Sequence, residues 1–255
     1  VDLAKVDPAS ELMRQIRWGE ISMVFQEPMT SFSAYHTLGD QISEALLVHR
    51  DVSKREARQM TIEMLERVGI PNASTRIHQY PHEFSGGMRQ RAMIAMALIC
   101  KPSLLIADEP TTSLDVTIQA QMLALMQDLR RDFGSSIMFI THNLGVIAQI
   151  ADEVSIMYLG KVVKHGSVGD IFHNPKHPYT IDLLNAIPKI SGQKKERLVA
   201  IEGNIPSPFE RVSGCPFHPR CSRIIKGLCE TEVPPEIDFG NHHFALCHLY
   251  SESAN

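Results

Sequence analysis

Short apolar runs without polar alternation mark the strands that this chain is expected to form. They lie at residues 21–25, 104–107, 137–140 and 154–159. Such runs are typical of a parallel sheet covered by helices on both faces, because both sets of side chains are then buried. The pattern therefore predicts an α/β fold.

Amphipathic segments predict the helices between these strands. Leu12, Met13, Ile16 and Trp18 indicate a helix that leads into the first strand. Ser53 opens a Ser-Lys-Arg-Glu capping box, and an apolar face follows it at Ala57, Met60, Met64, Leu65 and Val68, up to Gly69 and Pro71. Another helix is expected after Asp115, with a buried stripe at Ile118, Met122, Leu125, Leu129 and Phe133, and with Gly134 beyond its end.

The composition changes after about residue 169, where frequent prolines interrupt any long element. We expect a second, smaller and irregular unit over residues 169–255, and a core over residues 1–168. The net charge of −4 argues against nucleic acid as a partner, since proteins that bind phosphate backbones carry a basic surplus.

No apolar run reaches the length of a membrane span, and the start of the chain lacks the pattern of a signal peptide. We therefore expect the chain on the cytoplasmic side. Because it begins with Val1 and with what reads as the middle of a fold, we also expect an N-terminal piece to be missing.

Two neighbouring carboxylates end one of the predicted strands. Residues 104–110 read Leu-Leu-Ile-Ala-Asp-Glu-Pro, so Asp108 and Glu109 come at the carboxyl edge, where open α/β sheets bind ligands. Side chains alternate along a strand, so one carboxylate can hold Mg²⁺ while the other addresses an attacking water. A solvated turn is the alternative.

Polar residues also follow two other predicted strands. Gln26 closes the first strand, and the strand at residues 137–140 is followed by Thr141, His142 and Asn143. Taken alone, each is most simply a surface residue. If they share an edge with Glu109, the imidazole of His142 would come near the terminal phosphate of a nucleotide.

A Ser-Gly-Gly sequence opens a further predicted helix. Glycines let a backbone approach a ligand closely, and a helix N-terminus favours an anion, so Ser85 and the amide of Gly87 are candidate phosphate contacts. A flexible loop with an ordinary serine cap is the alternative.

The order and spacing of these motifs resemble those of ABC ATPases over roughly residues 16–166. Gln26 resembles their Q-loop, residues 85–90 their signature, residues 104–110 their Walker B strand, residues 113–115 their D-loop, and His142 their switch histidine. The resemblance implies an ABC-type P-loop NTPase core, with a parallel sheet flanked by helices and a helical subdomain over about residues 40–100.

Carried over residue by residue, the resemblance also implies roles in ATP hydrolysis. Asp108 and Gln26 would organise Mg²⁺, Glu109 would be the general base, and His142 would stabilise the γ-phosphate. Nucleotide contacts would come from Ser85, Gly86, Gly87 and Gln90, and Asp115 would link the two sites of an ATPase dimer.

One family motif does not occur. These 255 residues contain no Gly-x-x-x-x-Gly-Lys, the loop whose amides and lysine cradle the phosphates of ATP, and no upstream aromatic residue to stack on adenine. We therefore expect the chain to be truncated before the Q-loop and, by itself, not to hydrolyse ATP at a meaningful rate.

Three segments resemble one branch of the family in particular, the oligopeptide, dipeptide and nickel importers. They are residues 26–31, 111–121 and the run Asn-Pro-Lys-His-Pro-Tyr-Thr at residues 174–180. The last segment is assigned to packing, with Thr180 as a candidate cap for the helix that follows.

The branch implies a motor subunit peripheral to the cytoplasmic face of the inner membrane. Its partners would be a second, identical or homologous, ATPase chain, two membrane-spanning permease subunits and, indirectly, an extracellular substrate-binding protein. Candidate contacts with the permease are Tyr35, Leu38 and Ile42.

Four of the five cysteines lie near the C-terminus, at Cys215, Cys221, Cys229 and Cys247. Without an export signal they favour a metal over disulfides, and both zinc and an iron–sulfur cluster accept four cysteines. The resemblance favours a [4Fe-4S] cluster, with zinc and free thiols as alternatives.

Two other functions compete with the transporter motor. One is an ABC ATPase without a membrane partner, although the coiled-coil insertion or second ATPase unit usual in such proteins is not visible. The other is a metal-binding dimerisation scaffold without turnover.

Overall fold

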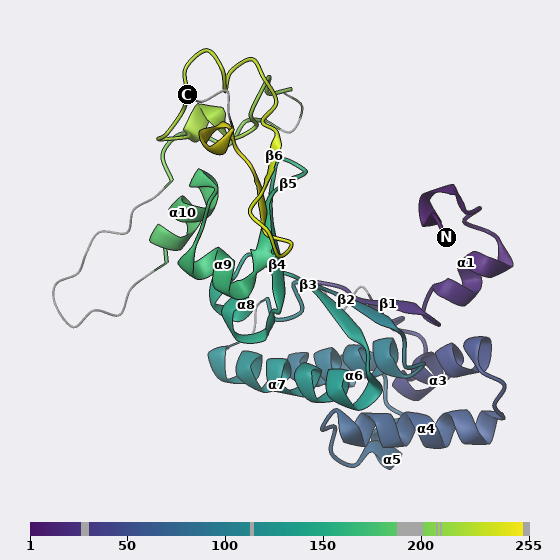
Figure 1. Ribbon diagram of the computed structural model, residues 1–255. Coiled ribbons are helices and arrows are strands. Elements are labelled where there is room, and N and C mark those ends of the chain that lie inside the picture. The colour runs from purple at the N-terminus through teal and green to yellow at the C-terminus, as the bar shows by residue number, and fades with distance from the viewer. Residues whose placement is uncertain (27–30, 113–114, 188–200, 208, 210, 252–255) are drawn as a thin grey trace. The chain divides into compact units, whose positions relative to one another are not determined.

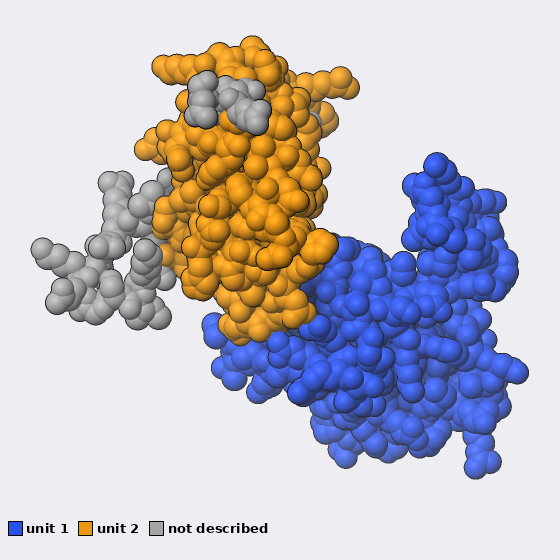
Figure 2. All heavy atoms as spheres, viewed as in Figure 1, with its two compact units in different colours: residues 1–142 blue, residues 143–255 orange. Residues whose placement is uncertain are grey.

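The computed structural model describes residues 1–26, 31–112, 115–187, 201–207, 209 and 211–251. They form two compact units, Val1–His142 and Asn143–Asn255, which are coloured separately in Figure 2 and described separately here. This division groups residues 143–168 with the tail, whereas the sequence placed them in the core; the domain limit after residue 168 stays a prediction.

The first unit contains a parallel sheet with the strand order β1-β2-β3. Its strands are β1 (Ile21–Val24), β2 (Leu104–Asp108) and β3 (Ser136–Ile140) (Figure 1). In register, Val24 pairs with Ala107, and Asp108 pairs with Ile140. The parallel sheet predicted from the apolar runs is confirmed for these three strands, and their carboxyl ends meet at one edge.

The helices of the first unit are α1 (Glu11–Ile16), α3 (Leu38–His49), α4 (Lys54–Arg67), α5 (Ala73–Arg76), α6 (Gly86–Leu98) and α7 (Val116–Phe133), with 3₁₀ turns at Leu3–Lys5 and Pro81–Glu83. Three of them, α4, α6 and α7, begin directly after Ser53, Ser85 and Asp115, where the sequence predicted helices. The capping box of α4 is confirmed: the Ser53 hydroxyl accepts from the Glu56 amide at 3.2 Å, and the Glu56 carboxylate accepts from the Ser53 amide at 2.8 Å.

The core of this unit lies between the sheet and helices α3, α4, α6 and α7. Its fully buried side chains include Leu38, Ile42, Leu46, Leu65, Met93, Ile94, Leu105, Met122 and Leu129. On α7 the buried stripe runs through Met122, Leu123, Met126 and Leu129, while the predicted members Ile118, Leu125 and Phe133 are only half-buried. The stripe is thus rotated slightly from the prediction.

The second unit is built around an antiparallel sheet with the order β4-β5-β7-β6. Its elements are α8 (Leu144–Ile150), β4 (Glu153–Tyr158), β5 (Lys161–Ser167), α9 (Val168–His173), α10 (Pro178–Asn185), β6 (Glu236–Asp238) and β7 (Phe244–Leu246), with 3₁₀ turns at His218–Arg220 and His248–Tyr250. Strand β7 is paired by both β5 and β6. The tail is therefore a folded unit, and not merely irregular.

One strand prediction was wrong. The run at residues 154–159 was expected in the parallel sheet, buried on both faces, but β4 belongs to the antiparallel sheet and its burial alternates. Val154, Ile156 and Tyr158 point inward, whereas Met157 is 58% exposed. The alternation was missed because, of the two solvent-facing residues Ser155 and Met157, the second is apolar.

Candidate functional site at the carboxyl edge of the parallel sheet

The edge formed by the ends of β1, β2 and β3 brings three of the predicted residues together. Gln26 follows β1, Glu109 follows β2 and His142 follows β3. Parallel neighbours deliver such positions to one edge of a sheet, which explains how residues so distant in sequence meet. All three belong to the first unit.

The carboxylate of Glu109 is the centre of this group. Its Oε2 accepts hydrogen bonds from Gln26 Nε2 and from Thr112 Oγ1, both at 2.9 Å, and its Oε1 lies 2.8 Å from His142 Nδ1. The Glu109 side chain is 21% exposed and that of His142 is 75% exposed. Glu109 is therefore mostly shielded from solvent, whereas the imidazole of His142 is accessible to it.

Hydrogen bonding sets the ionisation of this carboxylate. The bond with His142, followed by that from Thr112, lowers the pKa of Glu109 from its ordinary value. At neutral pH the side chain is thus a carboxylate, which is the form that accepts protons. We refer to Gln26, Glu109, Thr112 and His142 as the Glu109 cluster.

The backbone also fixes Glu109 in place. Its φ of +44° lies in the left-handed region, and its amide donates to the carbonyl of Ile140 at 2.9 Å. Non-glycine residues in this region are held there by their surroundings and are common at functional sites. The chain thus turns sharply at the end of β2, and Glu109 faces its neighbours on both adjoining strands.

Sequence reasoning missed Thr112. It lies three residues after Glu109, and its amide also donates to the Glu109 carbonyl, at 3.1 Å. A hydroxyl three residues beyond a carboxylate in a tight turn is the signal that would have found it.

Asp108, the predicted Mg²⁺ organiser, lies at the end of β2 and is half-buried. Within the described part of the chain no hydrogen bond joins its side chain to the Glu109 cluster. Its predicted role in holding Mg²⁺ stays a prediction.

The Ser-Gly-Gly segment stands at the N-terminus of α6, as predicted. Ser85 caps the helix by accepting from the amide of Met88 at 3.4 Å. A side-chain carbon built on Gly86 would meet nothing within 4 Å, so this turn has open space around it. Gln90 is 3% exposed and does not reach the surface in this conformation.

Asp115 caps α7, because its carboxylate accepts from the amide of Ile118 at 2.9 Å. No hydrogen bond between described residues ties Asp115 or the Ser-Gly-Gly turn to the Glu109 cluster. The predicted contacts of Ser85, Gly86, Gly87, Gln90 and Asp115 with nucleotide or with a second ATPase stay predictions. Ser113 lies outside the described residues.

The prediction of contacts with a permease was wrong for two of the three candidate residues. Tyr35 is 89% exposed, but Leu38 and Ile42 are both fully buried in the core of the first unit. They lie on the inner face of α3, since they are spaced four residues apart. Leu38 and Ile42 therefore stabilise the fold and cannot touch a partner in this conformation.

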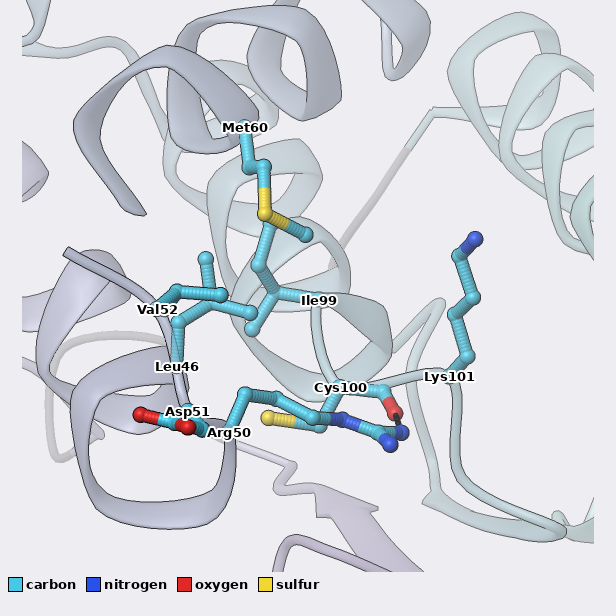
Figure 3. A pocket seen from close by; sticks show the side chains of 8 residues that line it. All are labelled: Leu46, Arg50, Asp51, Val52, Met60, Ile99, Cys100 and Lys101. Atoms are coloured by element: carbon cyan, nitrogen blue, oxygen red, sulfur yellow. Dashed lines mark hydrogen bonds between the residues drawn. The ribbon is translucent and has the colours of Figure 1, made fainter. Parts of the chain in front are cut away.

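A separate hollow of about 330 Å³ lies between α3, α4 and the end of α6 (Figure 3). Its lining is Leu46, Arg50, Asp51, Val52, Met60, Ile99, Cys100 and Lys101. The guanidinium of Arg50 donates to the Cys100 carbonyl there. None of the predicted site residues lines it, so it plays no part in the site at the sheet edge.

The four late cysteines lie near one another in the second unit and are free thiols. The thiol of Cys247 interacts electrostatically with those of Cys215, Cys221 and Cys229. We call these four residues the cysteine cluster. Three of them are buried, and Cys221 is half-buried.

Backbone amides face the sulfurs of the cysteine cluster. Cys229 Sγ accepts from the amide of Ile225 at 3.4 Å. Burial raises the pKa of Cys247 to about 11 and also raises the pKa values of Cys215 and Cys221, and in each case a hydrogen bond from a backbone amide opposes the rise. Every sulfur thus has an amide that would stabilise its thiolate.

These sulfurs do not form a preassembled site for a single ion. Among the described residues no group of three or more His, Cys, Asp or Glu side chains is arranged so that it could hold a metal ion. The predictions of zinc and of an iron–sulfur cluster are therefore not supported by a preformed arrangement of metal ligands.

None of the helices in the described ranges combines the length and the apolar character needed to cross a bilayer.

Two protein-family models match the chain, one in each unit. The model described as ABC transporter matches residues 3–112, and the one described as oligopeptide/dipeptide transporter, C-terminal region, matches residues 163–229. The second match covers α9, α10 and three of the four members of the cysteine cluster.

Relatives of high identity extend along nearly the whole chain. A putative peptide import ATP-binding protein of Brucella ovis is 52% identical, with 100% of this chain and 76% of the relative covered. The oligopeptide transport ATP-binding protein AppD of Bacillus subtilis is 50% identical, with 93% of this chain and 72% of the relative covered. OppD of Haemophilus influenzae is 47% identical, with coverages of 97% and 76%.

Solved structures support the fold. The dimeric ADP- and phosphate-bound ATP-binding cassette MJ0796 superimposes with a TM-score of 0.56 at 23% identity, over 64% of this chain and 68% of that chain. The cassette cbiO1 of Clostridium perfringens gives a TM-score of 0.54 at 25% identity, over 65% and 64%. Together with the relatives, these matches show that the chain belongs to the ABC transporter ATPases, in the branch of the oligopeptide/dipeptide transporter ATP-binding proteins.

Proposed function

We propose that the protein binds and hydrolyses ATP as the motor subunit of an importer for peptides, with nickel as a further candidate cargo. The observation that carries this proposal is the Glu109 carboxylate, held by Gln26, Thr112 and His142 at the carboxyl edge of the parallel sheet. The relatives named for peptide import supply the class of cargo.

In this proposal Glu109 takes a proton from the water that attacks the γ-phosphate. A lowered pKa keeps its carboxylate ionised, and three hydrogen bonds fix the direction of its lone pairs. His142, whose side chain is 75% exposed, would contact the γ-phosphate, and Gln26 would join Asp108 in organising Mg²⁺. When bound, Mg²⁺ would offset the negative charge that develops on the phosphates.

A second ATPase chain would complete the nucleotide site. The turn at Ser85, Gly86 and Gly87 has open space around Gly86 and no tie to the Glu109 cluster, which suits contact with a nucleotide held by a partner. Closure of the pair would drive two membrane-spanning permease subunits, peripherally at the cytoplasmic face of the membrane, with an extracellular substrate-binding protein acting indirectly.

The 255 residues contain no Gly-x-x-x-x-Gly-Lys. We infer that a chain of these residues alone does not hydrolyse ATP at a meaningful rate, because it lacks the amides and the lysine that hold the phosphates.

The decisive experiment measures phosphate release by the full-length protein and its Glu109→Gln variant. The amide keeps the shape of the side chain but cannot accept a proton, so we expect turnover to fall by about 10²-fold or more while ATP binding persists. The exposed Glu63→Gln on α4 is the matched control and should retain full activity.

Wild-type turnover in Glu109→Gln would exclude Glu109 as the general base. Co-purification with apolar permease subunits separates the importer from an ABC ATPase without a membrane partner. ATP binding without turnover in every form would favour the dimerisation scaffold.

The cysteine cluster is proposed to hold a [4Fe-4S] cluster. Four free, mutually close thiols with amides directed at their sulfurs suit the group by number, type and burial. Zinc, which four cysteine thiolates also accept, is the alternative. When bound, such a cluster would supply a redox-active or purely structural crosslink between the cysteine-bearing turns.

A further inference from the structure

The half-buried side chain of Thr112 lies against the Glu109 carboxylate and makes no contact that the proposed function uses. Thr112 Oγ1 donates to Glu109 Oε2 at 2.9 Å, and the Thr112 amide donates to the Glu109 carbonyl at 3.1 Å. A hydroxyl has a single hydrogen to donate, and in Thr112 this hydrogen lies on Glu109. Two hydrogen bonds thus join the same two residues across one turn of the chain.

This turn is a place where the chain needs support. Glu109 has a φ of +44°, a conformation in which a residue with a side chain persists when its surroundings hold it. One restraint is the hydrogen bond from the Glu109 amide to the carbonyl of Ile140 at 2.9 Å, and another is the backbone bond with Thr112. Thr112 therefore acts on both the backbone and the side chain of Glu109.

The two oxygens of the Glu109 carboxylate differ in their hydrogen bonds. Each oxygen of a carboxylate has about two lone pairs that can accept a hydrogen. Oε2 accepts from Gln26 Nε2 and from Thr112 Oγ1, so both of its lone pairs are used. Oε1 has His142 Nδ1 as its partner among the described residues, at 2.8 Å, and keeps one lone pair free. A proton that comes to Glu109 is therefore received at Oε1.

The three partners of this carboxylate also differ in the tasks that the proposed function gives them. Gln26 is assigned to Mg²⁺ and His142 to the γ-phosphate, and these two residues follow the strands on either side of β2. Thr112 has no such second task, and it belongs to the same turn as Glu109. When the other two side chains turn toward the nucleotide, the bond from Thr112 stays and holds Oε2.

We propose that Thr112 is the positioning residue of the general base, and that it fixes Oε2 so that Oε1 receives the proton of the attacking water. In that step the proton passes from water to Oε1 while the water oxygen forms a bond to the γ-phosphorus. The bond from the γ-phosphorus to the leaving β-phosphate oxygen breaks, and its electron pair stays on that oxygen. This role of Thr112 rests on the proposed function, since it requires Glu109 to be the base.

The test is Thr112→Val in the full-length protein. Valine is β-branched like threonine but has no hydroxyl, so the backbone bond of the turn is kept and the bond to Oε2 is lost. Thr112→Ser keeps the hydroxyl and is the candidate for rescue. Thr75→Val, at an exposed position on α5, is the matched control.

The first readout is phosphate release at varied ATP concentration. We expect kcat of Thr112→Val to fall about 10- to 100-fold, because the carboxylate is then free to turn away from the water. KM for ATP should change by less than about twofold, since Thr112 does not touch the nucleotide in this arrangement. Thr112→Ser and Thr75→Val should stay within about threefold of the wild-type kcat.

Three results of this readout contradict the positioning role. Wild-type kcat in Thr112→Val would mean that the hydroxyl is not needed. A raised KM with unchanged kcat would make Thr112 a nucleotide contact instead, and loss of ATP binding in Thr112→Val would make its role structural. Failure of Thr112→Ser to restore kcat would assign the loss to the methyl group and its packing.

The second readout is the double variant Glu109→Gln, Thr112→Val. A residue that acts through Glu109 has nothing left to position once the base is removed, so Thr112→Val should lower the residual turnover of Glu109→Gln by less than about twofold. A further fall as large as that in the wild-type background would show that Thr112 acts independently of Glu109. Wild-type turnover in Glu109→Gln alone would sink the proposed function, whereas loss of turnover in Glu109→Gln together with full turnover in Thr112→Val would sink only the role of Thr112.

Discussion

Lys164 in β5 offers the sharpest prediction about stability. Its side chain is fully buried, and its ammonium donates to the carbonyls of His165 at 2.9 Å and Phe244 at 3.3 Å. Burial lowers its pKa to about 8, the carboxylate of Asp170 opposes this, and Lys176 adds to it. A charge in this position is costly to the folded state.

The cost follows from the change in pKa. Lowering the pKa from 10.5 to about 8 costs the folded state about 3 kcal/mol while the lysine stays charged. Below pH 8 both states carry the proton and the cost is complete. Between pH 8 and 10.5 the unfolded chain binds more protons than the native one, so the free energy of unfolding rises with pH. By pH 10 it has regained about 2 kcal/mol of the cost.

The perturbation is Lys164→Met, which keeps the length of the stem and removes the charge. Since two carbonyls lose a donor, we expect a net gain of about 1–2 kcal/mol at pH 7. The stability advantage of the variant over wild type should then shrink by about 2 kcal/mol between pH 7 and pH 10. This difference between the two proteins cancels the titration of groups that do not interact with Lys164. Of the groups that do interact with it, Asp170, His177 and His243 have lowered pKa values and titrate below pH 7.

The assay is urea unfolding of both proteins at several pH values, followed by circular dichroism and by tyrosine fluorescence. Trp18 reports separately on the first unit, which should not respond. The exposed Lys161→Met on the same strand is the control and should give a difference that does not depend on pH. A constant difference between wild type and Lys164→Met over this range would show that the pKa of Lys164 is not lowered in the folded state.

Two further predictions concern the first unit. Leu38→Ala should cost about 2–5 kcal/mol in urea unfolding because it removes a fully buried side chain, whereas Tyr35→Ala, at 89% exposure, should change stability by less than about 0.5 kcal/mol; similar costs for the two would contradict the burial of α3. Gly39→Ala should destabilise by about 1–3 kcal/mol or more, since its new carbon would lie 2.0 Å from Ile77 Cγ1 and 2.6 Å from the Ile77 carbonyl. A thermal melt of Gly39→Ala beside Gly86→Ala, where a side-chain carbon meets nothing within 4 Å, tests this, and equal melting temperatures would count against the close approach.

Local signals were read reliably from the sequence. The capping box at Ser53 depends on residues three positions apart and is present in the structure, and helices begin after Ser85 and Asp115 as predicted. Three of the four apolar runs became parallel strands. Because their carboxyl ends share an edge, the sequence also predicted that Gln26, Glu109 and His142 would meet.

The fourth apolar run and the candidate permease contacts were misread for a common reason. The apolar character of a residue does not determine whether its side chain faces solvent. Met157 is exposed, while Leu38 and Ile42 are buried. Burial is decided by what packs against each face, and a single sequence does not contain that information.

The three strands of the parallel sheet, the capping box of α4, the polar residues at the ends of β1, β2 and β3, and the number and type of the cysteines were evident from the order of residues. The fold was needed to show that β4 leaves the parallel sheet, that Leu38 and Ile42 are buried, and that the four late cysteines lie near one another. The difference between the two sets of features is one of range. Caps and strand runs are set by neighbours along the chain, whereas each of these features depends on where a distant backbone atom or side chain comes to lie.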